Sequence, residues 1–94
     1  MKIRWTRRAI SALASIHTYI SKDSPDAAGR VAATVLDAMT QLERFPESGR
    51  VGRIEGTREL VVPGLPYVIL YRVEDEVIVI LSVIHTSRKW PKKI

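Results

Sequence analysis

The stretch RELVVPGLPYVILYRVEDEVIVILSVI, residues 58–84, contains three apolar segments that are separated by short turns. The segments run from Arg58 to Val62, from Tyr67 to Val73 and from Val77 to Ile84, and their β-branched and aromatic residues favour strands. The connections between them are too short for a crossover, so neighbouring strands must run in opposite directions. The stretch therefore predicts a three-stranded antiparallel meander.

The last of these strands is apolar on both of its faces. Apolar side chains occupy nearly every position: on one face Val77, Val79, Leu81 and Val83, and on the other Ile78, Ile80 and Ile84. An antiparallel strand with one face in water would instead alternate between apolar and polar residues. The second face therefore needs a cover, which could be the C-terminal tail with Trp90, a second copy of the chain or a partner chain.

The first residues of the chain predict a strand followed by a helix. Ile3 and Trp5 alternate with polar neighbours, which is typical of a strand with one apolar face. Thr6 can then cap a helix that runs to about Ser21. The apolar residues of this segment keep the spacing of an amphipathic helix: Ala9, Ala12, Leu13, Ile16 and Ile20.

A second helix is predicted to begin only a few residues later. Ser-Pro-Asp at residues 24–26 supplies a capping serine, a proline for the first turn and an acid that the helix dipole favours. The apolar face of this helix ends near Phe-Pro at residues 45–46. The short link between the two helices predicts an antiparallel helical hairpin.

These segments together predict an α+β fold with the order β-α-α-β-β-β. Residues 47–57 contain three glycines and are predicted to form the loop between the second helix and the meander. No linker or repeat divides the chain, so we expect a single domain over residues 1–94. In this fold, the helical hairpin packs on one face of an antiparallel sheet.

The composition excludes several classes of protein. The 94 residues are 46% hydrophobic and 27% charged, which is typical of a folded domain. The absence of cysteine excludes disulfide scaffolds, thiolate zinc sites and thiol nucleophiles, and two histidines are too few for a typical zinc site. No apolar run is long enough to span a membrane, and the basic start lacks an apolar signal core. We therefore expect a cytoplasmic protein that needs no metal or cofactor.

The net charge of +5 comes mainly from arginine. Ten of the fifteen cations are arginines, and residues 1–22 carry five cations and no acid. Because arginine binds phosphate and carboxylate groups through paired hydrogen bonds, this pattern indicates an anionic partner, either nucleic acid or an acidic protein segment. Arg7 and Arg8 oppose the dipole of the first predicted helix, so they are either tolerated surface residues or contacts to such a partner.

Four motifs and their order resemble the RelE/ParE superfamily, the toxins of bacterial type II toxin–antitoxin modules. These motifs are FPESGR at residues 45–50, TRELVVPG at 57–64, YVILYRV at 67–73 and HTSRKWP at 85–91. The resemblance covers almost the whole chain. It implies a growth-inhibiting toxin, of the kind that stabilises plasmids, which an acidic antitoxin holds inactive in a hetero-oligomer.

Two mechanisms divide this superfamily, and the resemblance implies different site residues for each. RelE-like members cleave mRNA on the ribosome, whereas ParE-like members poison DNA gyrase and are not known as nucleases. Cleavage needs a base, an acid and cations that stabilise the charge on phosphorus. The candidates here are His85 as base or acid and Arg58, Arg72 and Arg88 as phosphate clamps; Tyr71 or Trp90 could stack on a base.

The sequence departs from the RelE-like pattern at three places. Residues 58–62 offer one cation beside an acid, where RelE-like nucleases carry a lysine-rich catalytic strand. Tyr67 is followed by Val68, where RelE-like nucleases usually carry an arginine, and residues 88–91 replace their tyrosine-bearing basic tail. The closing motif is more similar to the ParE-like branch. We therefore favour a gyrase-poisoning toxin without catalytic residues over a ribosome-dependent endonuclease that would use His85, Arg58 and Arg88. A non-toxic module that binds nucleic acid or protein is the third interpretation.

The residues expected to contact the antitoxin or the target are mostly arginines. They are Arg50, Arg53, Arg58, Arg72, His85, Arg88 and Trp90. The expected partners are a cognate acidic antitoxin and DNA gyrase, or alternatively the ribosome and mRNA. Enzymatic activity is expected only in the RelE-like case.

Overall fold

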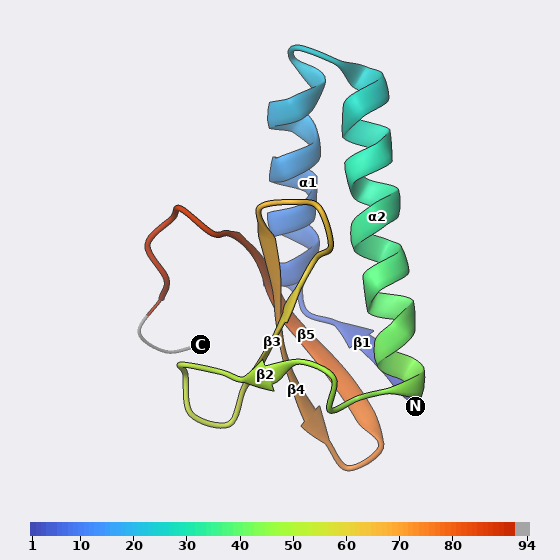
Figure 1. The fold of residues 1–94 in the computed structure, drawn as a ribbon, viewed down its shortest axis with the longest axis vertical. Coiled ribbons are helices and arrows are strands. Elements are labelled where there is room, and N and C mark those ends of the chain that lie inside the picture. Colours follow the sequence, from blue (N-terminus) through green and yellow to red (C-terminus); the bar gives the residue numbers. More distant parts are fainter. Residues whose placement is uncertain (92–94) are drawn as a thin grey trace.

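The computed structural model describes residues 1–91 and follows the predicted order of elements (Figure 1). The chain forms β1 (Lys2–Trp5), α1 (Arg7–Ser21), α2 (Pro25–Arg44), β2 (Arg50–Val51), β3 (Arg58–Val61), β4 (Tyr67–Glu74) and β5 (Val77–His85). The strands form one sheet in the order β1-β5-β4-β3-β2. The predicted α+β fold class is therefore confirmed.

The predicted meander is also confirmed. β3, β4 and β5 pair antiparallel in the order in which they follow one another along the chain. A bulge interrupts the pairing of β4 with β5: Leu70 lies opposite Ser82, whereas Tyr71 lies opposite Ile80. Leu81 therefore has no partner residue in β4. Beyond this bulge, the alternate side chains of β5 exchange the faces of the sheet to which they point.

The sheet differs from the predicted one at its two edges. β1 runs parallel to β5, with Lys2 opposite Val77 and Trp5 opposite Ile80, so the sheet is mixed and not wholly antiparallel. Short connections fix the directions of the three meander strands, but they do not constrain β1, which is far from β5 in the sequence. At the other edge, β2 pairs antiparallel with β3 inside the segment predicted as loop, and its two residues are too few to show a strand pattern.

Both helices begin at the predicted capping residues. The Thr6 hydroxyl accepts a hydrogen bond from the Ala9 N–H at 3.1 Å, and the Ser24 hydroxyl accepts one from the Ala27 N–H at 3.1 Å. Such side chains satisfy backbone donors that have no partner within the first turn of a helix. Neither helix within residues 1–91 combines the length and the apolar character needed to cross a bilayer.

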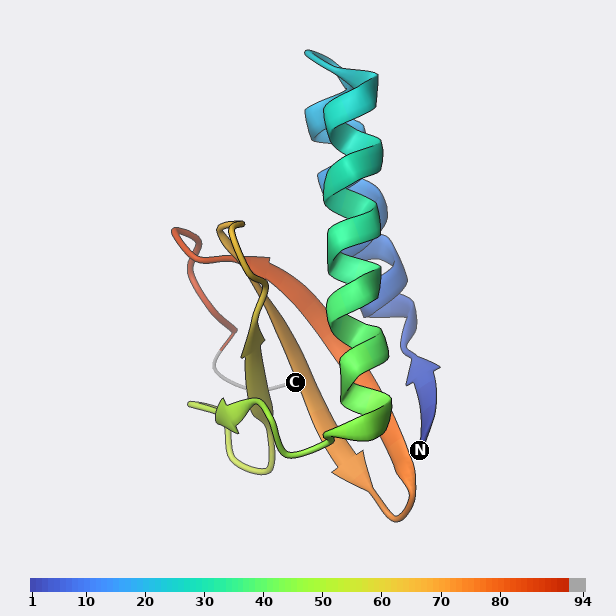
Figure 2. The same cartoon turned by 45° about the vertical axis from the view of Figure 1, so that its right-hand side comes forward.

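The two helices pack on one face of the sheet and bury the larger apolar cluster there (Figure 2). Burial of this apolar surface is the main force that holds the hairpin on the sheet. The buried members from the helices are Ala9, Val35, Ala38, Met39 and Leu42, and those from the strands include Ile69, Tyr71, Ile78 and Ile80.

The opposite face of the sheet is covered by other parts of the same chain. Ile54, from the connection between β2 and β3, forms a second cluster with Leu70, Val79, Leu81 and Ile84. Trp90 from the C-terminal tail packs against this cluster, so the tail, one of the three covers considered from the sequence, lies over part of the second face. This double cover explains why β5 is apolar on both sides.

Candidate binding groove

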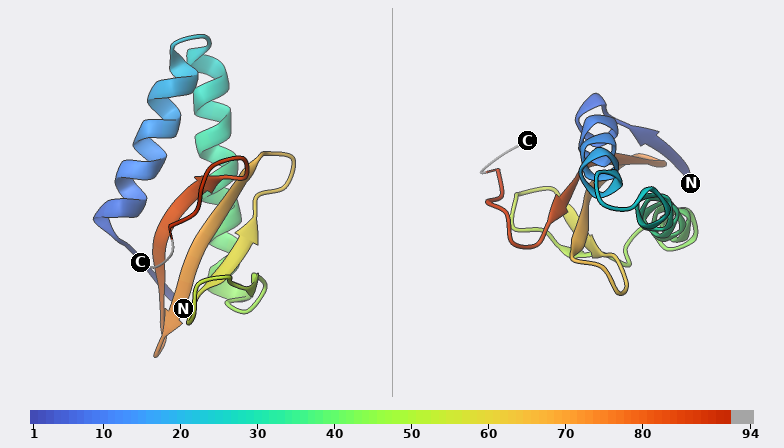
Figure 3. Two further views of the ribbon diagram at one scale, coloured as in Figure 1. Left: turned by 90° about the vertical axis from the view of Figure 1, so that its left-hand side faces the viewer. Right: turned by 90° about the horizontal axis from the view of Figure 1, so that it is seen from above.

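A groove of about 730 Å³ opens between α1, the end of β5 and the tail at residues 86–91. Figure 3 shows the tail turning back beside β5. The lining residues are Arg8, Ser15, Ile16 and Tyr19 of α1, Tyr67 of β4, residues 82–85 of β5 and residues 87–91 of the tail.

The edge of β5 that borders this groove has no neighbouring strand in the described part of the chain. β1 pairs only with residues 77–80 of β5. There the Thr6 hydroxyl donates a hydrogen bond to the Ile80 carbonyl at 2.8 Å, and the chain turns into α1. An unpaired strand edge offers backbone N–H and C=O groups to an added extended chain.

The groove is cationic and partly apolar. Arg8, Arg88 and Lys89 line it, and none of its described lining residues is acidic. Ile16 and Tyr19 add apolar surface from α1, and Tyr19 is 70% exposed. This combination suits a peptide that carries acidic and apolar side chains, and its cations also suit phosphate groups.

His85 lies at the end of β5, inside the groove and half-buried. Its Nδ1 accepts a hydrogen bond from the Ser87 backbone N–H at 3.1 Å, and the Ser87 hydroxyl lies 2.7 Å from the same atom. The ring meets Tyr67 edge-on, with 5.3 Å between the ring centres. Because Nδ1 accepts the hydrogen bond from Ser87, it is not free to take a proton from a bound substrate in this arrangement.

Arg58 is held away from the groove by the connection that follows α2. Its guanidinium donates hydrogen bonds to the carbonyls of Gly49 at 2.8 Å and Glu47 at 3.3 Å. The buried Tyr71 hydroxyl fixes the same connection: it donates to the Pro46 carbonyl at 2.8 Å and accepts from the Gly49 N–H at 2.9 Å. Burial raises the pKa of Tyr71, which therefore stays a neutral donor at physiological pH. Arg58 thus supports the fold in this structure.

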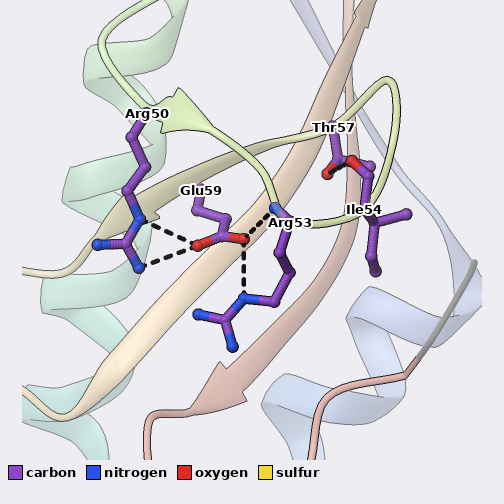
Figure 4. Close-up of polar contacts among 5 residues, drawn as sticks. All are labelled: Arg50, Arg53, Ile54, Thr57 and Glu59. Carbon is purple, nitrogen blue, oxygen red and sulfur yellow. Dashed lines mark hydrogen bonds and ion pairs between the residues drawn. The ribbon is translucent and has the colours of Figure 1, made fainter.

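Arg50 and Arg53 converge on Glu59, which is only 2% exposed (Figure 4). One carboxylate oxygen, Oε1, accepts from Arg50 Nε at 3.0 Å and lies 2.9 Å from its terminal nitrogen. The other, Oε2, accepts from the Arg53 backbone N–H at 2.8 Å and from Arg53 Nε at 3.2 Å. Burial by itself would raise the pKa of Glu59, but these hydrogen bonds outweigh it and hold the pKa below its ordinary value.

Trp90 connects the ion pairs around Glu59 to the groove. The guanidinium carbon of Arg53 lies 3.7 Å from the centre of the Trp90 ring, within the range of a cation–π contact. Trp90 also lines the groove, as does Arg88 two residues before it. Arg72 is placed elsewhere: it forms an ion pair with Glu74 at 3.1 Å on β4.

The structure thus divides the sequence-predicted site residues between three places. His85, Arg88 and Trp90 line the groove, Arg50 and Arg53 bind Glu59, and Arg58 and Arg72 contact other parts of the sheet and its connections. Sequence reasoning missed Glu59 and Tyr19. An acid at an inward position of a strand, preceded by arginines in a glycine-rich segment, is a signal that could have identified Glu59.

The chain is similar to a family of toxins over nearly its whole length. Residues 3–90 match the family model of the ParE toxin of type II toxin–antitoxin systems, parDE. The chain is 50% identical over 91 residues to protein Y4kP of Sinorhizobium fredii, covering 97% of this chain and 94% of that protein. It is 38% identical over 87 residues to toxin RelE2 of Caulobacter vibrioides, covering 93% of this chain and 97% of that toxin.

Two solved structures share the architecture. A chain of the chromosomal ParDE toxin–antitoxin system of P. aeruginosa superposes with a TM-score of 0.84 at 24% identity, covering 93% of this chain and 97% of that one. A chain of the toxin–antitoxin complex RelBE2 of Mycobacterium tuberculosis gives a TM-score of 0.60 at 32% identity, covering 89% and 95%. The first likeness, at its low identity, shows the fold alone.

Proposed function

Because the chain belongs to the ParE toxin family of type II toxin–antitoxin systems, we propose that it arrests growth by binding DNA gyrase. We further propose that a cognate antitoxin neutralises it by occupying the groove between α1, β5 and the C-terminal tail. Gyrase acts in the cytoplasm, so the toxin is expected to act there too.

The observation that carries the gyrase proposal is the separation of the residues that a nuclease would need. Arg58 donates to backbone carbonyls after α2 and does not line the groove that contains His85 and Arg88. His85 Nδ1 is occupied by Ser87. The arrangement supports recognition of an anionic partner better than concerted transfer of two protons at a phosphate.

The chemistry of the groove supports an acidic antitoxin segment as its occupant. Carboxylates of such a segment could pair with Arg8, Arg88 and Lys89, and its apolar residues could cover Ile16 and Tyr19. An extended part of the segment could add to the free edge of β5. Both solved relatives belong to toxin–antitoxin systems, which is consistent with such a partner.

A ribosome-dependent endonuclease is the second candidate. It is favoured by the similarity to the toxin named RelE2 and by the meeting of His85 with three cations in one groove. In this case Arg8 or Lys89 would take the place of Arg58 as the phosphate clamp. His85 would first take the proton of the 2′-hydroxyl as base and then donate it to the leaving oxygen as acid.

Purified toxin distinguishes the two candidates directly. We expect it to stabilise covalent gyrase–DNA cleavage complexes on supercoiled plasmid, and to leave mRNA intact on translating ribosomes. Arg88→Gln should weaken the gyrase effect, whereas Arg30→Gln, an exposed arginine of α2 outside the groove, should not. Ribosomal cleavage that is lost in His85→Ala, with no effect on gyrase, would replace the proposal by the endonuclease.

A further inference from the structure

The C-terminal tail is fastened to the sheet mainly through one side chain. Its described backbone hydrogen bonds lie near its start, from Thr86 N–H to the Pro66 carbonyl at 2.9 Å and from Arg88 N–H to the His85 carbonyl at 3.0 Å. Beyond them, Trp90 packs against the apolar cluster on the second face of the sheet. The position of residues 87–91, which form one wall of the groove, therefore depends on how firmly Trp90 is seated.

Arg53 lies over the Trp90 ring and is itself held in place by Glu59. The carboxylate oxygen Oε2 accepts hydrogen bonds from both the backbone N–H and Nε of Arg53, at 2.8 and 3.2 Å (Figure 4). An arginine side chain free in water samples many rotamers, and ordering it opposes any contact that it makes. Because Glu59 already orders Arg53, its planar guanidinium can bind the Trp90 ring with little further loss of entropy.

We propose that Glu59 is a positioning residue for the groove: it fixes Arg53, Arg53 seats Trp90 on the sheet, and the seated Trp90 holds the tail in place as the groove wall. Glu59 itself does not line the groove and acts on it only through these two residues. The role concerns the free chain, so it holds whichever target or antitoxin the groove binds.

The chain contains a matched control for this role. Arg50 binds the other oxygen of the same carboxylate, at 3.0 and 2.9 Å, and it is about as exposed as Arg53. Arg53 is the cation that lies over the Trp90 ring. Arg50→Gln and Arg53→Gln therefore remove comparable ion pairs from Glu59, but only the second also removes the contact with Trp90.

Trypsin can report the position of the tail, because Arg88 and Lys89 are cleavage sites within it. Proteolysis of a transiently released segment follows the population of the released state when release is fast. We expect Arg53→Gln and Glu59→Gln to accelerate cleavage at Arg88 and Lys89 by about 2–5-fold, the change that corresponds to loss of one exposed cation–π contact. Arg50→Gln should leave this rate close to that of the wild type. Cleavage at Arg30 in α2, followed in the same digests by mass spectrometry, reports global unfolding.

Three results would overturn the proposal. The first is an equal acceleration of tail cleavage by Arg50→Gln and Arg53→Gln, and the second is a failure of Arg53→Gln or of Glu59→Gln to accelerate it. The third is tail cleavage that rises only in step with cleavage at Arg30. If Glu59→Gln fails to fold, Glu59→Asp provides the comparison, because it keeps the charge but shortens the reach to Arg53. No toxicity or target assay enters the experiment, so failure of the gyrase proposal leaves its outcome unaffected.

Discussion

The Glu59 carboxylate is buried in β3, where it accepts hydrogen bonds from one backbone N–H and two guanidinium groups. Its pKa is lower in the folded chain than its ordinary value, although burial opposes this shift. A carboxyl group of this kind stabilises the fold at any pH above its unfolded pKa. The stabilisation is lost as the pH falls through the folded pKa, when the carboxyl is protonated in both states.

Glu59→Gln should therefore be destabilising at neutral pH but not in acid. We expect the free energy of unfolding to fall by about 1.5–3 kcal/mol at pH 7, the usual contribution of hydrogen bonds to a charged group. The difference from the wild type should shrink as the pH drops below the ordinary glutamate pKa of about 4.3. Urea unfolding across this range measures it. Glu55→Gln is the control, because Glu55 is exposed in the loop that precedes β3; an equal loss in that variant would contradict the prediction.

Gly49 and Tyr71 form a second site where a single residue controls the local structure. A Cβ added at Gly49 would lie 2.6 Å from the Tyr71 hydroxyl oxygen and 2.7 Å from a ring carbon. The same hydroxyl bonds to the Gly49 N–H and the Pro46 carbonyl, so little room exists for either group to move.

Gly49→Ala is expected to lower the free energy of unfolding by about 1–3 kcal/mol, the usual effect of overpacking a buried site. Gly29→Ala should have the opposite sign, because the added Cβ has no atom within 4 Å and alanine favours a helix by about 0.5–1 kcal/mol. Thermal or urea unfolding of the two variants checks this. If Gly49→Ala left the free energy of unfolding unchanged, the connection after α2 would move more easily than its contacts indicate.

The sequence revealed the types of these residues but not their partners. Arg58 and Glu59 are adjacent in β3, yet alternation along the strand places them on opposite faces of the sheet. Arg58 therefore meets the carbonyls after α2, whereas Glu59 meets Arg50 and Arg53. Such pairings depend on how the segment at residues 47–57 folds, and its irregular backbone carries no periodic signal.

Among the elements, the helices and the meander could be predicted because their signals are local. Capping residues mark both helix starts, and short turns fix the strand directions. The parallel pairing of β1 with β5 could not be predicted, since it joins residues more than seventy positions apart. The groove follows from the same pairing: β1 ends opposite Ile80, and no strand within residues 1–91 pairs with the rest of β5 along this edge.

Thr6 is the residue that joins these elements. Its hydroxyl accepts from the first turn of α1 and donates to the Ile80 carbonyl at 2.8 Å, where β1 leaves the edge of β5. The Ser24 hydroxyl caps α2 in the same way, through its bond to the Ala27 N–H at 3.1 Å. The two caps therefore differ in that the Thr6 hydroxyl also bonds to the sheet, through the Ile80 carbonyl.

We expect Thr6→Ala to lower the free energy of unfolding more than Ser24→Ala does. Loss of a cap alone accounts for about 0.5–2 kcal/mol in each variant. Thr6→Ala also leaves the Ile80 carbonyl without its side-chain donor, which adds about 0.5–1.5 kcal/mol. Thr6→Ser should restore most of the loss because it retains the hydroxyl. Equal losses at the two caps, measured by urea unfolding, would mean that the link to β5 contributes nothing.

For the whole molecule, the placement of charge matters more than its total. The net charge of +5 suggested an anionic partner from the composition alone. In the folded chain, Arg50, Arg53 and Arg72 lie against acids, and Arg58 lies against carbonyls. Among the described residues that line the groove, Arg8, Arg88 and Lys89 lie together and no acid accompanies them.

Local and total charge can be separated by two triple variants with the same net charge. One replaces the groove cations, Arg8, Arg88 and Lys89, by glutamine. The other replaces Arg7, Lys22 and Arg30, which are exposed and do not line the groove. Each variant removes three positive charges, so long-range attraction of an acidic antitoxin falls about equally in both.

A cognate antitoxin is expected to bind the groove variant about 10-fold more weakly than the wild type, since three lost surface ion pairs at about 0.2–1 kcal/mol each correspond to a change of this order. The other triple variant should stay within about 3-fold of the wild type, because only screened, long-range attraction is lost. Calorimetry at low and at moderate salt measures both, and rising salt should weaken the wild type more than the groove variant. Equal weakening of the two variants would mean that the antitoxin responds to net charge, and it would then have to dock somewhere other than the groove.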